Sequence, residues 1–169
     1  YNKWYRDIQN VVLDAMQTLP YFCYLIPVLM FFGGNIVSAV IATVIYSVPP
    51  IIRLTALGLS QVSGGYSEVS KSFGGTGIQT LNKVKFPLAV PSLVMGFNQT
   101  VIMAFAMQIV TPLIGGKGLG LQVFNALQRS DTGRGLSAGL AIVLLAIIID
   151  RITHAWTKKQ RQALGLDQS

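Results

Sequence analysis

The stretch from residue 15 to residue 52, AMQTLPYFCYLIPVLMFFGGNIVSAVIATVIYSVPPII, contains no Asp, Glu, Lys, Arg or His. The stretch from 86 to 116 is equally free of these residues. A membrane-spanning helix needs about 20 mostly apolar residues, so the first stretch has room for two spans and the second for one. A charge at the centre of a span costs roughly 2.5–3.5 kcal/mol, which explains why both stretches lack charges. They predict a chain that crosses a membrane several times.

The composition agrees with a membrane location. Hydrophobic residues make up 51% of the chain and charged residues 11%, against about 25% charged in soluble domains. A large soluble helical core is disfavoured because its helices would show charged outer faces. The net charge of +7 does not indicate nucleic-acid binding, because most aromatic residues lie inside apolar runs rather than on a basic surface.

We expect an all-α, polytopic transmembrane helical bundle in one domain, residues 1–169. Its four spans are expected at 8–32, 36–54, 88–113 and 136–152. Residues Gly33 to Asn35 form the turn between the first two spans, because Gly and Asn tolerate positive φ.

The distribution of Lys and Arg predicts the orientation. With four spans, both termini and the 55–87 loop share one side, which receives ten of the 13 Lys and Arg residues. Only Lys117, Arg129 and Arg134 fall on the other side. Because Lys and Arg are enriched in cytoplasmic loops, we expect the termini and the 55–87 loop in the cytoplasm.

The 55–87 loop itself has the pattern of a helical hairpin. Residues 66–73 are long enough for two helical turns, and Gly74 with Gly75 can end them. Thr76 and Gln79 have the spacing of a capping box, which begins a second helix. Pro87 marks the return to the membrane. A hairpin with an apolar stripe can bind in a groove of another protein, whereas a plain connecting loop would not need two ordered helices.

This loop resembles the EAA loop of bacterial ABC-importer permeases. That pattern is Glu-Ala-Ala, three residues, Gly, nine residues, Ile, one residue, Leu-Pro. The matching positions here are Glu68, Gly74, Val84 and Pro87, with Val69 and Ser70 in place of the alanines and Phe86 in place of Leu.

Segments outside the loop resemble the permease subunits of glycine betaine/proline importers. They are QTLPYFCYLIP from 17 to 27, VPPIIRLT from 48 to 55, SKSFG from 70 to 74, GFNQT from 96 to 100, IGGKGLG from 114 to 120 and IDRIT from 149 to 153. The resemblance implies a type I ABC importer permease fold, further spans before residue 1, and a multi-pass location in the bacterial cytoplasmic (inner) membrane. It also implies a quaternary-amine osmoprotectant such as glycine betaine or proline betaine as cargo.

The resemblance further implies a coupling role for the loop. Docking on a separate ATPase subunit is expected to involve Glu68, Val69, Ser70, Phe73, Gly74 and Pro87. ATP and Mg would be bound by that ATPase, and no cofactor is expected in this chain. The other expected partners are a second permease copy as a homodimer, a substrate-binding protein and membrane lipid.

Candidate pathway-lining residues lie in the third expected span: Asn98, Gln99, Met103 and Met107. Polar groups in lipid usually face a protein interior or a cavity, although interhelical hydrogen bonding is the commoner fate of such residues. With one His, one Cys and six acidic residues scattered along the chain, we expect neither a catalytic group nor a metal site, and no enzymatic activity.

Two alternatives remain open. The same permease class can carry choline, carnitine or another small amine, because a separate binding protein selects the cargo. A self-contained channel or ion-coupled carrier would place ionisable residues inside its spans. This second alternative is disfavoured, because the stretches 15–52 and 86–116, which make up most of the first three expected spans, carry no charged residue and Asp150 lies at the end of the fourth.

Overall fold

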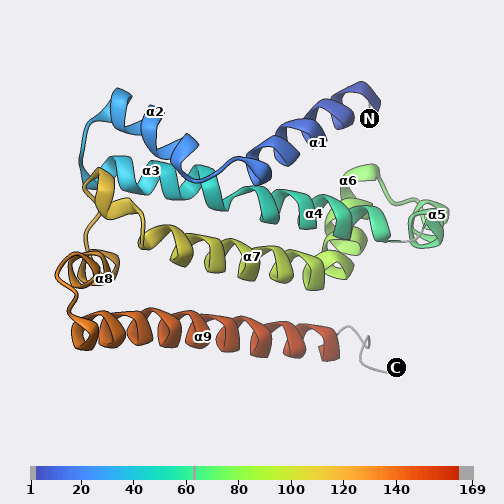
Figure 1. Ribbon diagram of the computed structural model, residues 1–169. Helices are drawn as coiled ribbons and strands as arrows, with labels where there is room; N and C mark the ends of the chain where they lie inside the picture. The colour runs from blue at the N-terminus through green and yellow to red at the C-terminus, as the bar shows by residue number, and fades with distance from the viewer. Residues whose placement is uncertain (1–2, 63, 164–169) are drawn as a thin grey trace. The chain divides into compact units, whose positions relative to one another are not determined.

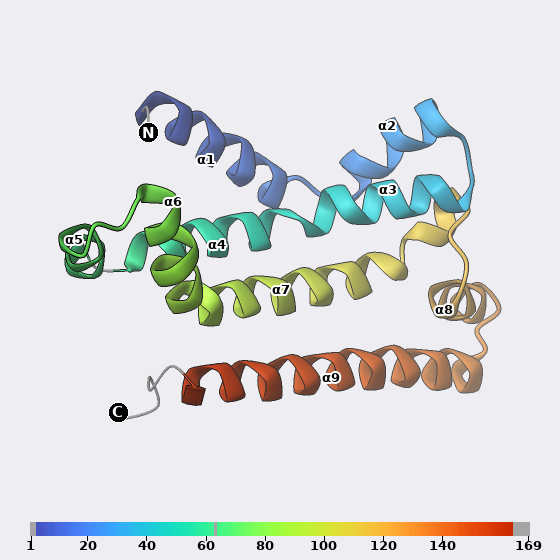
Figure 2. The ribbon, with the colours of Figure 1, turned by 180° about the vertical axis from the view of Figure 1, so that it is seen from behind.

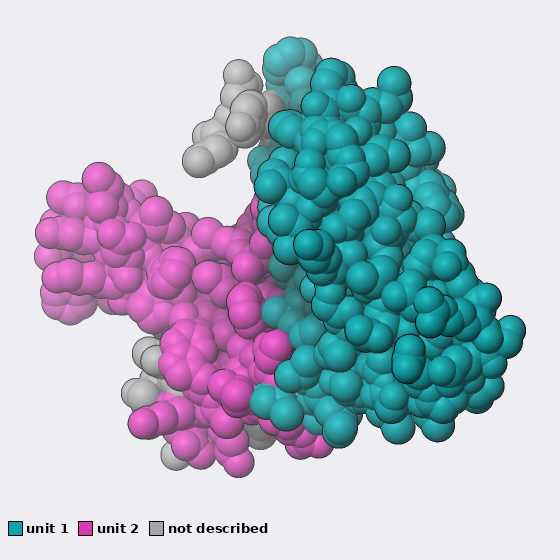
Figure 3. Space-filling model, turned by 90° about the vertical axis from the view of Figure 1, so that its left-hand side faces the viewer, with its two compact units in different colours: residues 1–49, 100–148 teal, residues 50–99, 149–169 magenta. Residues whose placement is uncertain are grey.

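A computed structural model describes residues 3–62 and 64–163, and helices are its only regular elements within those ranges (Figure 1). The expected domain, 1–169, extends beyond the described residues at both ends. The described chain divides into two compact units, drawn in different colours in Figure 3. Unit 1 combines residues 1–49 with 100–148, and unit 2 combines residues 50–99 with 149–169.

Three helices are long and apolar enough to cross a membrane, and a bent pair of helices makes a fourth if it is taken as one span. The three are Ile36–Gln61, Gly77–Gln108 and Thr132–Lys159. Ile36–Gln61 is made of α3 (Ile36–Ser47) and α4 (Pro49–Gln61). The all-helical prediction is confirmed for the described residues.

The expected first span, 8–32, is not one straight helix. It is α1 (Lys3–Thr18) followed by α2 (Phe22–Phe32), with a bend of 94° between them. Pro20 lies in the break, where it supplies no backbone N–H and disfavours a helical conformation at the residue before it. The Thr18 hydroxyl donates to the carbonyl oxygens of Asp14 and Ala15 at the end of α1.

In unit 1, α2 and α3 lie side by side in both views (Figure 1 and Figure 2). The expected turn between them is present, with Gly33 at φ +73°. The Asn35 side chain caps α3 by accepting hydrogen bonds from the amides of Val37 and Ser38 at 2.8 and 3.0 Å. The apolar core of this unit consists of Leu25, Val28, Ala39, Ala42, Met107 and Ile114.

The third expected span, 88–113, ends earlier than predicted. Helix α7 (Phe86–Gln108) stops at Gln108, and a short 3-10 helix, η2 (Thr111–Ile114), follows. Pro112 supplies no amide to continue the α-helical ladder. Gly115, at φ +91°, then lies against the turn between α2 and α3. A Cβ on Gly115 would come within 2.7 Å of the Asn35 backbone nitrogen.

Helix α8 (Leu119–Gln128) packs closely on the end of α7. A Cβ added at Gly120 would lie 1.8 Å from the carbonyl oxygen of Gln108, so only glycine fits there. This close approach fixes α8 within unit 1.

In unit 2, small residues bring α4 and α7 close together. A Cβ at Gly58 would lie 2.5 Å from the Ser92 Cβ, and one at Gly96 would lie 3.0 Å from the Ile51 Cα. Such small-residue contacts are typical of helix pairs in membranes. Helix α9 (Thr132–Ala163) continues well beyond the expected end at Ile152. The polar residues that follow Ile152 are compatible with a helix, so the end of the apolar run does not end the helix.

Candidate functional site

The predicted hairpin is present in unit 2. Helix α5 (Gly64–Ser72) ends before Gly74, which has φ +76°, and α6 (Gly77–Thr80) begins after Thr76. The capping box is formed in both directions: the Thr76 hydroxyl accepts from the Gln79 amide at 3.4 Å, and the Thr76 amide donates to Gln79 Oε1 at 2.9 Å. The Thr76–Gln79 spacing therefore correctly predicted the start of this helix.

A hydrogen bond that the sequence did not reveal connects the two hairpin helices. The hydroxyls of Ser70 on α5 and Thr80 on α6 lie 2.8 Å apart, and Thr80 is buried. Gly75 approaches Ser70 so closely that a Cβ would lie 2.7 Å from the Ser70 carbonyl oxygen. These contacts give the hairpin a defined geometry.

The hairpin carries a shallow groove of about 430 Å³. It is lined by Tyr66, Val69, Ser70, Phe73, Gly75, Gln79, Lys83 and Val84. Phe73 is 88% exposed, and Tyr66 and Val69 are each more than half exposed. Large apolar side chains at such exposure on an ordered hairpin are typical of a protein-binding surface.

The six residues expected to dock have different structural roles. Val69 and Phe73 contribute apolar surface, Ser70 bonds across the hairpin, and Gly74 makes the turn. Glu68 is exposed and forms no ion pair within the described part of the chain.

Pro87 does not interrupt the chain's helical path. A π-helical turn, η1 (Leu81–Lys85), leads from α6 directly into α7, and Pro87 occupies the first turn of α7. The helical segment Gly77–Gln108 therefore connects the hairpin to the span without a loop.

The four candidate pathway residues have different environments. Asn98, in unit 2, is 8% exposed, and Met107, in the core of unit 1, is 1% exposed. Neither side chain lies on an open surface in this structure. Gln99 is exposed and Met103 is half-buried. Their role in a pathway remains a prediction.

Asp150 is a hydrogen-bond partner of Asn98 that the sequence did not reveal. Asn98 Nδ2 donates to Asp150 Oδ1 at 3.1 Å, and both residues belong to unit 2. His154 Nε2 lies 3.4 Å from the same carboxylate oxygen. An acidic residue directly after the apolar run 136–149 was the available signal, but the sequence did not identify its partner.

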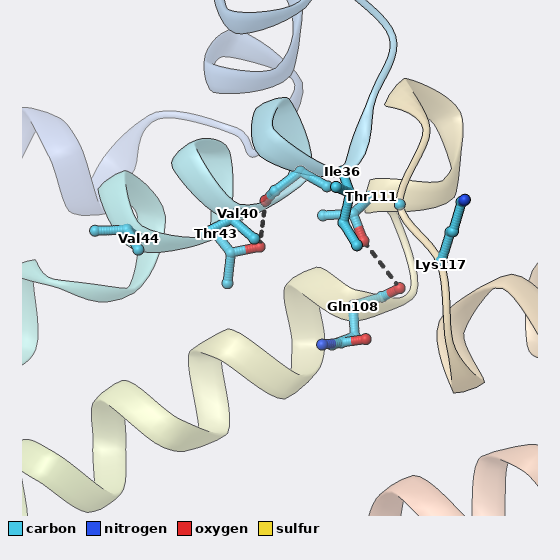
Figure 4. A pocket seen from close by; sticks show the side chains of 9 residues that line it. Ile36, Val40, Thr43, Val44, Gln108, Thr111 and Lys117 are labelled. Atoms are coloured by element: carbon cyan, nitrogen blue, oxygen red, sulfur yellow. Dashed lines mark hydrogen bonds between the residues drawn. The ribbon is translucent and has the colours of Figure 1, made fainter.

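A cleft of about 210 Å³ lies in unit 1, between α3 and the segment that follows α7 (Figure 4). It is lined by Ile36, Ala39, Val40, Thr43, Val44, Gln108, Thr111, Gly116 and Lys117. The hydroxyls of Thr43 and Thr111 donate to the carbonyl oxygens of Ala39 and Gln108. The side-chain donors left for a ligand in this cleft are therefore the Gln108 amide and the Lys117 ammonium. Within the described residues, no group of three or more His, Cys, Asp or Glu side chains could hold a metal ion.

Residues 1–162 match the family model described as "Binding-protein-dependent transport system inner membrane component". The chain is 47% identical over 156 residues to the glycine betaine/carnitine transport permease protein GbuB of Listeria monocytogenes, covering 92% of this chain and 55% of that protein. It is 45% identical over 150 residues to the glycine betaine/proline betaine transport system permease protein ProW of Escherichia coli, covering 89% of this chain and 42% of that one. The chain thus spans about half the length of these curated relatives.

The fold also matches a solved structure. A chain of the MetNI methionine ABC transporter, in an inward-facing conformation, superposes with a TM-score of 0.76 at 21% identity. The match covers 90% of this chain and 76% of that one. It supports the type I importer permease fold expected from the sequence.

Proposed function

The chain belongs to the binding-protein-dependent transport system inner membrane component family, and on that premise we propose that it is the permease subunit of an ATP-driven importer. In this role its spans contribute to the translocation pathway, and its hairpin receives force from a separate ATPase. The observation that carries the proposal is an ordered hairpin whose exposed apolar groove continues by helix into a membrane span.

The hairpin is the proposed docking element. Its groove offers an aromatic and aliphatic surface to a partner, and Lys83 adds a positive charge at that surface. The capping box and the Ser70–Thr80 bond support docking because a preordered element loses less conformational entropy on binding. Glu68 is exposed and available to a partner, but apolar contacts at Phe73 are expected to contribute more binding energy.

The proposed assembly contains two permease copies, an ATPase subunit that binds ATP and Mg, and a substrate-binding protein. Its proposed location is the bacterial cytoplasmic membrane, with the hairpin and both termini in the cytoplasm. The distribution of Lys and Arg supports this orientation. The family description supports the binding protein, because transport in this family depends on one.

The proposed cargo is a small quaternary amine such as glycine betaine or proline betaine. Support comes from GbuB and ProW, whose names specify glycine betaine with carnitine or proline betaine. Carnitine and choline are the alternative cargoes within the same chemistry.

The test uses the full-length protein assembled with its ATPase and binding protein in proteoliposomes. We expect ATP-dependent uptake of radiolabelled glycine betaine. Phe73→Asp should reduce ATPase association and uptake at least 10-fold, because it places a charge in the apolar groove. Leu127→Asp is the matched control, since Leu127 is also exposed (68%) but lies on α8, outside the hairpin.

Two results would contradict the proposal. Absence of ATP-dependent uptake by the wild-type assembly would reject the importer function. Wild-type uptake that Phe73→Asp and Leu127→Asp reduce equally would reject the hairpin as the docking element.

A further inference from the structure

A buried amide and a carboxylate join two helices in unit 2. Asn98, on α7, is 8% exposed and donates from Nδ2 to Asp150 Oδ1 on α9 at 3.1 Å. Asn98 Oδ1 is buried without a partner in the described structure. A buried amide is costly unless it is hydrogen-bonded, so this single bond is what makes the position of Asn98 tolerable.

The bond also indicates the depth of Asp150. Asn98 lies about 18 Å along α7 from Phe86 and about 15 Å from Gln108, at 1.5 Å per residue. Asn98 is therefore near the middle of the α7 span, and Asp150 is held at the same level, inside α9 rather than at the end of a span as expected from the sequence. An ionised group at that depth needs a protein partner or water, because lipid cannot solvate it.

An apolar groove lies beside this bond, lined by residues that neighbour Asn98 and Asp150 in sequence. This groove of about 340 Å³ is lined by Ile51, Phe86, Val90, Leu93, Val94, Phe97, Thr153 and Trp156. These residues come from α4, α7 and α9 of unit 2. Apolar contacts alone allow several registers of one helix on another, whereas a hydrogen bond from a buried amide to a half-exposed carboxylate favours one.

Movement of the hairpin has a direct route to Asn98. The helical segment Gly77–Gln108 contains the second hairpin helix, the π-helical turn and Asn98 without a break. Helix α9 is not connected to the hairpin by a short piece of chain. Within the described part of unit 2, the Asn98–Asp150 bond is a specific polar link from that segment to α9.

We propose that Asn98 and Asp150 are positioning residues whose hydrogen bond sets the register of α9 against α7, so that hairpin movement is passed to both helices. This inference rests on the proposed coupling function of the hairpin. The bond is needed for transport yield per ATP, while ATP binding and hydrolysis occur in the partner.

The experiment exchanges the two groups in the full-length assembled transporter. Asn98→Asp places two carboxylates against each other and should lower the cargo moved per ATP by roughly 3- to 20-fold, the range expected for one interhelical hydrogen bond in a membrane. Adding Asp150→Asn restores an amide–carboxylate pair with its direction reversed. The double variant should recover to within about 2-fold of wild type. ATP hydrolysis and uptake are measured on the same vesicles.

Arg151→Gln is the matched control. It changes the charge by one unit beside Asp150, and Arg151 is exposed, so the ratio of uptake to hydrolysis should not change. An Asn98→Asp variant with the wild-type ratio would overturn the inference. A double variant no better than Asn98→Asp would also overturn it, including when the defect is loss of folded protein.

A second readout does not depend on transport. Leu93 and Thr153 both line the apolar groove, so cysteines at these positions can report the α7–α9 register by cross-linking in a Cys23→Ser background. Asn98→Asp should reduce the cross-linking yield, and the double variant should restore it. A yield that is unchanged in Asn98→Asp would overturn the inference even if the wild-type protein imported no betaine.

Discussion

At the scale of single residues, glycine determines where helices can touch. A Cβ at Gly120 would lie 1.8 Å from the Gln108 carbonyl oxygen, so Gly120→Ala must displace α8 from the end of α7. We expect a loss of about 1–3 kcal/mol of stability, which corresponds to a Tm lower by roughly 2–12 °C. Thermal unfolding of the purified chain in detergent measures this change.

Gly139→Ala provides the comparison. A Cβ at Gly139 meets nothing within 4 Å, and replacing a mid-helix glycine by alanine favours the helix by roughly 0.5–1 kcal/mol. Its Tm should equal or exceed that of wild type. If Gly120→Ala melted like Gly139→Ala, the close contact between α8 and α7 would be wrong.

The residues that the sequence predicted well are those whose signal is local. Thr76 and Gln79 are three positions apart, and their capping box is present. Ser70 and Thr80 are ten positions apart on different helices, so no spacing rule could pair them. The same limit applied to Asp150, whose partner Asn98 is 52 positions away.

At the scale of elements, the hairpin depends on the start of α6. Removing the cap with Thr76→Ala should cost about 1 kcal/mol, because the Gln79 amide loses its acceptor. Amide hydrogen exchange in residues 77–80 should become roughly 5-fold faster. Mass spectrometry of peptides from this region measures the rate.

Thr18→Ala is the control for that experiment. Thr18 is also an exposed threonine, but its hydroxyl donates to carbonyls at the end of α1 rather than capping a helix start. Exchange in residues 77–80 should remain at the wild-type rate in this variant. Equal acceleration in both variants would show that the capping box does not stabilise α6.

Two elements departed from the sequence prediction for physical reasons. The 8–32 segment is apolar enough to be predicted as one span. Hydropathy does not indicate the direction of a helix axis, so it could not reveal the 94° bend in the break that contains Pro20. The π-helical turn Leu81–Lys85 has no composition signal, because its residues are ordinary helix formers. Hydropathy therefore located the helices without determining their bends.

At the scale of the whole molecule, the proposed orientation has a direct test. In a Cys23→Ser background, a cysteine at Gln128 should react with a membrane-impermeant maleimide in intact cells. A cysteine at Ser72, in the hairpin, should react only after permeabilisation. Both native residues are exposed, so the difference reports the side of the membrane. The reverse pattern would contradict a cytoplasmic hairpin.

The expected spans 36–54, 88–113 and 136–152 each overlap a helix that is long and apolar enough to cross a membrane, but the ends of these helices differ from the expected ones. Helix α7 stops at Gln108 rather than 113, and α9 continues to Ala163 rather than ending at 152. A helix end is decided by turns and tertiary contacts, such as Gly115 lying against Asn35, that hydropathy does not encode. The cleft lined by Gln108 and Lys117 was missed for the same reason, since it joins segments that are distant in sequence.

The contact between Gly115 and the Gly34–Asn35 turn has a consequence for biogenesis. At about 5–20 residues per second, a ribosome needs roughly 4–16 s to translate the chain from Asn35 to Gly115. The Gly34–Asn35 turn leaves the ribosome before Gly115 is synthesised, so for that interval it lacks its contact with Gly115. Its Asn35 cap, made entirely from neighbouring residues, can hold the turn in shape during the delay.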